Sequence, residues 1–145
     1  MKKSDRLRPV KMLAENKVKD AAMHMARSSK AYEESLQQLA KLTHYREEYM
    51  TQFKAKGEKG IPAARLVEYQ AFVHKIDQAI EMQKQNVEKA RHDVGHKQAS
   101  FQAKHNRKKA VDKVIEKSRT SENMATDSRE QKEVDDRGQR GIRND

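Results

Sequence analysis

Apolar residues recur every seven residues in two long stretches of this sequence, and this repeat constrains the fold more than any other feature. A constant period of seven is typical of a helix that supercoils around a partner helix. In the first stretch, one heptad position, here called a, holds Val18, Met25, Tyr32, Leu39, Arg46 and Phe53. The second position, d, holds Ala14, Ala21, Ser28, Ser35, Leu42 and Tyr49. Nine of these twelve residues are apolar, so the stretch predicts a long coiled-coil helix.

The same repeat resumes further along the chain. Position a then holds Leu66, Val73, Ile80, Val87, Val94, Phe101, Lys108 and Ile115. Position d holds Tyr69, Ile76, Gln83, Ala90, Lys97, Lys104, Val111 and Ser118. An antiparallel arrangement places Phe53 beside Leu66 and Val18 beside Phe101, and one register joins all a positions between these pairs. We therefore expect an all-α fold, a two-stranded antiparallel coiled coil (helical hairpin) with a polar, flexible C-terminal tail.

Glycine and proline gather between the two repeats, in Gly57-Glu58-Lys59-Gly60-Ile61-Pro62. Gly57 can take the left-handed conformation that ends a helix, and Pro62 fits the first turn of the next helix. The second helix is expected to overhang the first from about Lys104, and Gly138 and Gly141 argue against a fully helical C-terminus. We predict one coiled-coil domain with five segments: a flexible N-terminus (1–9), a helix (10–56), a turn (57–62), a second helix (63–118) and a polar tail, partly helical or disordered (119–145).

The composition suits such a coiled coil better than a compact globule. Of the 145 residues, 34% are hydrophobic and 37% are charged, and a coiled coil needs apolar residues at only two positions in seven. The chain has no cysteine, which excludes disulfides and thiolate chemistry. The net charge of +10 comes from the two arms, and charge alone fits a nucleic acid, an anionic membrane or an acidic protein. Without an apolar run or signal core, a cytoplasmic location is expected.

Motifs of catalysis are missing from the sequence, so no enzymatic activity and no cofactor are expected. The Gly57–Gly60 stretch lacks the Lys-Ser/Thr pair of a phosphate-binding loop. Glu88, His92 and His96 share one helix stripe, which is a spacing that can bind a metal ion. No further ligand is evident to complete such a site, so surface residues are the favoured interpretation.

A basic cluster lies near the far end of the second helix and is formed by Lys104, Arg107, Lys108, Lys109 and Lys113. A charged face of this kind is sufficient for binding phosphates without sequence preference. No aromatic residue is interleaved with the cluster, so the stacking contacts of single-strand binders are missing. We favour a solvated surface or an acidic protein partner over an anionic lipid surface, and no nucleic acid is expected.

Tyr45 and Phe72 form the sharpest functional signal. Both fall at heptad position g, just outside the core, and they lie at almost equal distances from the turn. The g positions of two antiparallel helices border the same groove. Aromatic side chains exposed on a highly charged helical pair indicate a docking site for another protein.

At these residues the sequence resembles the FliJ family of flagellar export proteins. The matching pieces are Met12-Leu13-Ala14-Glu15, Tyr45-Arg46-Glu47-Glu48-Tyr49, Gly60-Ile61, Tyr69-Gln70-Ala71-Phe72 and Glu130-Gln131-Lys132-Glu133-Val134-Asp135-Asp136. The resemblance implies a non-enzymatic component of flagellar type III secretion that is similar to the central stalk of rotary ATPases. Its implied partners are the hexameric export ATPase FliI with its regulator FliH, the membrane export-gate protein FlhA, and export chaperones.

The resemblance also implies a surface for the export gate. It maps onto Gln38, Leu42, Tyr45, Tyr49, Phe72, Ile76, Ala79 and Gln83. The ends of the arms, which carry the basic cluster, are expected to enter the ATPase ring. The implied location is cytoplasmic and peripheral at the inner face of the cell membrane. The alternatives are a basic coiled-coil adaptor or stalk protein of a virulence secretion system and a nucleic-acid-binding hairpin.

Overall fold

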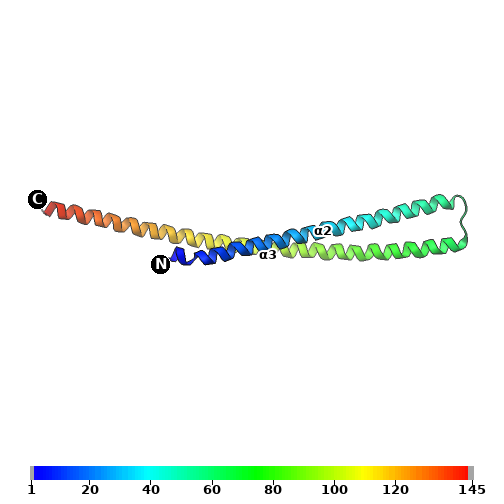
Figure 1. Cartoon of the computed structure of the whole chain (residues 1–145), viewed down its shortest axis with the longest axis horizontal. Coiled ribbons are helices and arrows are strands. Elements are labelled where there is room, and N and C mark those ends of the chain that lie inside the picture. The colour runs from blue at the N-terminus through cyan, green and yellow to red at the C-terminus, as the bar shows by residue number, and fades with distance from the viewer. Residues whose placement is uncertain (1, 144–145) are drawn as a thin grey trace. The chain divides into compact units, whose positions relative to one another are not determined.

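Two long helices and one short helix make up the protein in the computed structural model, which describes residues 2–143 (Figure 1). α1 spans Lys3–Arg6, α2 spans Arg8–Gly57 and α3 spans Ala63–Arg143. α2 and α3 pack against each other as an antiparallel hairpin, and the described residues contain no strand. The predicted all-α coiled-coil hairpin is therefore confirmed.

Contacts divide the chain into two compact units, where the sequence predicts a single domain. The hairpin unit comprises Ala22–Ser100 and contains the turn. The terminal unit combines Met1–Ala21 with Phe101–Asp145, so α2 and α3 each contribute to both units. Of the predicted flexible ends, residue 1 and residues 144–145 lie outside the part that the structure describes.

The turn between α2 and α3 uses a different glycine from the one predicted. Gly57 is the last residue of α2, whereas Gly60 has a φ of 86°, in the left-handed region that favours glycine. The N–H groups of Lys59 and Gly60 donate to the carbonyls of Lys56 and Gly57, each at 3.1 Å. These tight bonds carry the helical path past Gly57 and move the reversal to Gly60, so the predicted left-handed cap at Gly57 is wrong.

In the hairpin unit, the a and d side chains, here called the seam, face the partner helix. They are buried or half-buried, with the exception of Leu66, which is 45% exposed. Phe53 stacks on Tyr69 with ring centroids 3.6 Å apart, at the d position three residues after the Leu66 with which the register pairs it. Position a of α2 therefore meets position d of α3 near the turn.

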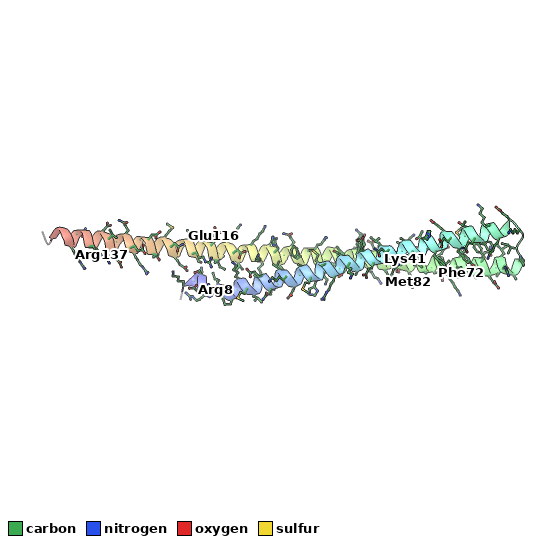
Figure 2. All side chains as sticks on the ribbon, turned by 45° about the horizontal axis from the view of Figure 1, so that its top comes forward. Arg8, Lys41, Phe72, Met82, Glu116 and Arg137 are labelled. Carbon is green, nitrogen blue, oxygen red and sulfur yellow. The ribbon has the colours of Figure 1, made fainter. Side chains whose placement is uncertain are left out.

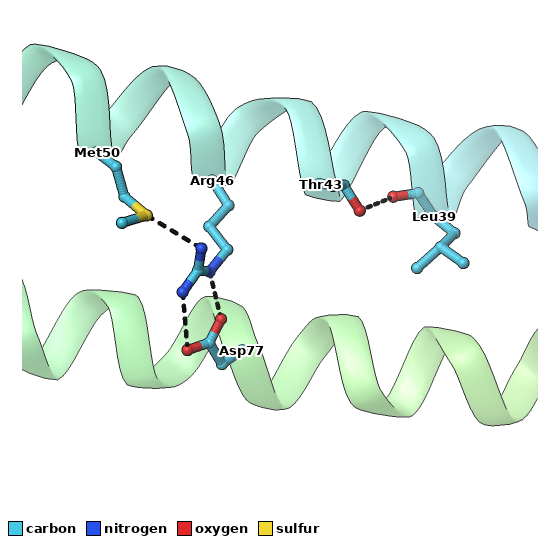
Figure 3. A network of polar contacts seen from close by, with 5 residues as sticks. All are labelled: Leu39, Thr43, Arg46, Met50 and Asp77. Carbon is cyan, nitrogen blue, oxygen red and sulfur yellow. Dashed lines mark hydrogen bonds and ion pairs between the residues drawn. The ribbon is translucent and has the colours of Figure 1, made fainter.

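Polar seam residues in this unit have partners across the hairpin. The buried Ser28 hydroxyl donates to the Asp93 carboxylate at 2.6 Å. The Arg46 guanidinium binds Asp77 through two N–H groups, one of them at 3.4 Å, and also contacts the Met50 sulfur at 3.0 Å (Figure 3). These contacts let serine and arginine occupy core positions that the heptad pattern reserves for apolar residues.

The start of the chain is paired with α3 in the terminal unit. The Ser4 hydroxyl and backbone N–H donate to the Glu122 carboxylate at 2.7 Å and 3.2 Å. The Lys11 ammonium lies 3.9 Å from the Asp112 carboxylate. The predicted start of the overhang at Lys104 is therefore wrong, and Ser4, within the segment predicted to be flexible, has a partner on α3. The heptad continues backwards through Lys11 and Ser4, where polar contacts replace apolar ones.

Beyond Glu122, α3 continues as a helix to Arg143, and residues 123–141 are exposed. Figure 2 shows α3 without a partner helix around Arg137. The helix therefore runs past the predicted boundary at residue 118 and continues through Gly138 and Gly141, which argued against a fully helical end. Opposite charges four residues apart, as in Arg129 with Glu133 and Asp136 with Arg140, favour an isolated helix and offset part of the cost of the two glycines.

None of the described helices contains a stretch that is both long and apolar enough to cross a membrane.

Candidate protein-docking surface

The structure brings the predicted aromatic pair together in the hairpin unit. α2 supplies Tyr45 and α3 supplies Phe72, and their ring centroids lie 6.2 Å apart at an interplanar angle of 76°. This edge-to-face arrangement is a favourable one for aromatic rings. The two g positions therefore border one groove, as the heptad register predicts.

The aromatic contacts continue from this pair toward the turn. Tyr49 packs on Phe72 with a centroid distance of 4.3 Å and stacks on Tyr69 at 5.5 Å. Tyr69 in turn stacks on Phe53. Five rings from both helices thus form one connected cluster, and packed aromatic rings lose little further conformational entropy when a partner binds. Tyr69 and Phe53 were assigned to the seam from the sequence, and only the structure connects them to Tyr45.

Burial differs among the eight predicted surface residues, of which Leu42, Tyr49 and Phe72 are half-buried. Tyr45 is 50% exposed, and Gln38 and Ala79 are exposed as well. Ile76 and Gln83 are only 6% and 9% exposed, so they lie in the seam. The exposed residues are accessible to a partner, whereas Ile76 and Gln83 are enclosed between the helices.

Gln83 occupies a d position and satisfies its amide inside the hairpin. Its Nε2 donates to the Ser35 carbonyl at 2.9 Å and reaches the Gln38 Oε1 at 3.4 Å. Its Oε1 accepts from the Asn86 side chain at 3.3 Å. A buried amide with partners on both helices costs little stability and orients the exposed Gln38 beside it.

A shallow groove of about 440 Å³ follows the exposed edge of the surface. Its lining consists of Gln38, Lys41, Leu42, Tyr45 and Gln83. Figure 2 labels Lys41 on α2 and Phe72 on α3 in this part of the hairpin. The groove combines apolar, amide and cationic groups, which is a combination that suits a protein partner.

The predicted basic cluster is not one uniform face. Lys104 and Lys108 are half-buried in the seam of the terminal unit, whereas Arg107, Lys109 and Lys113 are exposed. The half-buried lysines occupy d and a positions, where their aliphatic stems can cover the seam. Three of the five predicted residues are therefore available to an anionic partner.

Sequence reasoning missed the contact between Ser4 and Glu122. The Ser4 hydroxyl and N–H stabilise the carboxylate and lower the pKa of Glu122 below its ordinary value. Both residues continue the a position of their repeats, and this periodicity is the signal that could have found them.

The predicted histidine stripe does not form a metal site. Glu88 binds Arg91, and this contact lowers the pKa of the Glu88 carboxyl. The His92 imidazole lies 3.5 Å from the same carboxylate. Among the described residues, no three His, Cys, Asp or Glu side chains are placed to hold a metal ion. The surface interpretation remains the favoured one.

Comparison with known proteins agrees with these observations. A family model described as "Flagellar FliJ protein" matches residues 2–145. A relative named "Flagellar FliJ protein" from Escherichia coli (strain K12) is 28% identical over 134 residues, which cover 92% of this chain and 91% of the relative. A relative of the same name from Salmonella typhi is 26% identical over the same shares. No solved structure matches the chain significantly.

The fold and the surface define an antiparallel coiled-coil hairpin protein whose candidate site is an exposed aromatic surface. Because the family model covers almost the whole chain, the chain belongs to the FliJ family of flagellar proteins. It is a component of the flagellar export apparatus, as the resemblance implies.

Proposed function

We propose that the aromatic surface of the hairpin docks on the export-gate protein FlhA and thereby couples the export ATPase to the gate. The observation that carries this proposal is the edge-to-face pair of Tyr45 and Phe72, in which a half-exposed ring is supported from both helices. Aromatic anchors held in place by packed neighbours dominate many protein interfaces, and truncating one costs about 2 kcal/mol or more of binding free energy.

The buried residues of the surface give it a defined shape before binding. Ile76 and Gln83 are fixed in the seam, and Gln83 binds both Ser35 and Gln38. A surface that is already ordered loses less entropy when its partner binds. Gln38, Ala79 and Tyr45 would then make the outer contacts with the gate.

The same proposal assigns the terminal unit to the hexameric export ATPase FliI and its regulator FliH. Exposed Arg107, Lys109 and Lys113 would contact acidic groups of the ring and promote its assembly. Binding of export chaperones and a peripheral position at the inner face of the cell membrane complete the proposal. These assignments are supported by membership of the FliJ family and, for the ring, by the positive charge of Arg107, Lys109 and Lys113.

Gate docking can be tested with the purified protein and the cytoplasmic portion of FlhA. Tyr45→Ala and Phe72→Ala are each expected to weaken binding at least about tenfold, and the helix content by circular dichroism should stay nearly unchanged. Val67→Ala is the matched control, because Val67 is 65% exposed and lies outside the surface. Equal affinities for all three variants would refute the docking surface, and loss of helix in Phe72→Ala would refute its g-position assignment.

The ATPase contact is tested by titrating the protein into FliI while ATP hydrolysis and ring formation are followed. Stimulated hydrolysis with more hexamers in electron micrographs is the expected result. Lys109→Glu together with Lys113→Glu should reduce this stimulation and leave binding to FlhA intact. An active ATPase that does not respond to the protein would leave only the adaptor function.

A further inference from the structure

Charges in the terminal unit are sorted by helix face. Heptad positions g and c lie on one side of the helical pair, and positions e and b lie on the other. Within residues 3–21 and 101–121, the g and c positions carry five basic residues and a single acid, Asp20. The basic residues of this side, here called the basic face, are Lys3, Arg6, Lys17, Arg107 and Lys117.

The opposite side of the same helices is electrically balanced. Its e and b positions carry four basic and four acidic residues within the same ranges. The acids are Asp5, Glu15, Asp112 and Glu116. Both sides therefore carry a similar number of charged residues, and they differ in how basic and acidic residues are distributed between them.

Aliphatic side chains lie between the charges of the basic face. Val10, Leu13 and Val114 are 41%, 56% and 43% exposed. A groove of about 480 Å³ is lined by Lys3, Val114, Lys117 and three further residues, which shows that α1 and α3 meet on this side. The basic face is therefore a continuous cationic and aliphatic surface formed by both chain segments.

We propose that the basic face binds the surface of a bilayer that contains anionic phospholipids. Lysine and arginine at its edges would contact the headgroup phosphates, and the aliphatic side chains would enter the interface between headgroups and acyl chains. The g and c positions of this range include no aromatic residue, in contrast to the docking surface near the turn. Aliphatic residues between lysines and arginines suit a lipid surface, because headgroup phosphates and the adjacent acyl chains offer anionic and apolar groups side by side.

This inference does not depend on binding to FlhA or FliI. The ATPase ring is proposed to contact the same helical segment, so the ring and the bilayer would exclude each other. The protein would then bind the bilayer only while it is not bound to the ATPase ring.

The test uses the purified full-length chain and sedimentation with vesicles. Vesicles of phosphatidylcholine alone are compared with vesicles that contain about 30% phosphatidylglycerol. The face variant combines Lys17→Glu, Arg107→Glu and Lys117→Glu. The control variant combines Lys19→Glu, Lys109→Glu and Lys113→Glu, and it changes the net charge by the same amount at exposed positions outside the g and c side.

Binding only to the anionic vesicles is expected, with a loss of at least about tenfold for the face variant and a much smaller loss for the control. Equal losses for both variants would overturn the proposal, because binding would then follow net charge. No binding to anionic vesicles would also overturn it and would leave an acidic protein as the partner of this face. If the face variant loses its helical spectrum, Leu13→Ser replaces it, and unchanged binding by this variant would contradict insertion of the aliphatic side chains.

Discussion

Replacing Ile76 with alanine should destabilise the hairpin, because Ile76 is buried in the seam beneath the docking surface. Ile76 is 6% exposed at a d position, so the substitution removes three carbon atoms from the seam. At about 0.8 kcal/mol for each buried methylene, the transfer loss alone is about 2.4 kcal/mol. Ile→Ala changes in globular cores cost about 2–5 kcal/mol once the cavity is included. A two-stranded seam borders water and can relax, so we expect about 2–3 kcal/mol of lost stability.

The measurement is urea unfolding followed by circular dichroism. With a dependence of about 2 kcal/mol per molar urea, the midpoint should fall by roughly 1 M. Val67→Ala is the control, since Val67 is 65% exposed, and its stability should change by no more than about 0.5 kcal/mol. If Ile76→Ala and Val67→Ala unfold at the same urea concentration, Ile76 is not a core residue and the burial of the seam is wrong.

Three further predictions concern the turn, the terminal unit and the seam. Gly60→Ala should cost about 1–2 kcal/mol in urea unfolding because φ is 86°, whereas Gly57→Ala should be neutral or stabilising because its added Cβ meets its nearest neighbour at an ordinary 3.5 Å. The folded state lowers the pKa of Glu122, so its contact with Ser4 stabilises the protein above about pH 4.5 and is lost as the pH falls through the lowered value. Glu122→Gln should therefore flatten the acid side of a stability-against-pH curve, and an unchanged curve would contradict the contact. Arg46→Leu should be neutral or stabilising by about 1 kcal/mol in thermal unfolding, because a partly exposed ion pair contributes less than burial of an aliphatic side chain; a loss of more than 1 kcal/mol would show that the ion pair is worth more than this.

Much of the docking surface was predictable because a helix converts sequence spacing directly into direction. Once the heptad register was assigned, Tyr45 and Phe72 had to fall at g and border one groove. The same register placed Ile76 and Gln83 at d, where the structure shows them buried. Their place among the predicted contact residues followed the family resemblance and remains a prediction.

The errors arose where weak local signals competed with contacts distant in sequence. Residues 1–9 are polar, so the heptad that continues backwards to Ser4 carries no apolar signal there, and Glu122 lies 118 positions away. The left-handed glycine was placed at Gly57 because helix ends favour glycine, but two further tight hydrogen bonds moved the reversal to Gly60. At the C-terminus, Gly138 and Gly141 argued against a fully helical end, whereas the helix continues through both.

The sequence by itself therefore determined the class of fold, the position of the turn and the side of the helices that carries the aromatic pair. These features depend on periodicity, and a helix repeats its geometry with every turn. Only the tertiary structure decided how far the start of the chain accompanies α3, which polar seam residues find partners, and which surface residues are buried. These features depend on which side chains of two facing helices come within contact distance, and spacing along one chain does not contain that distance.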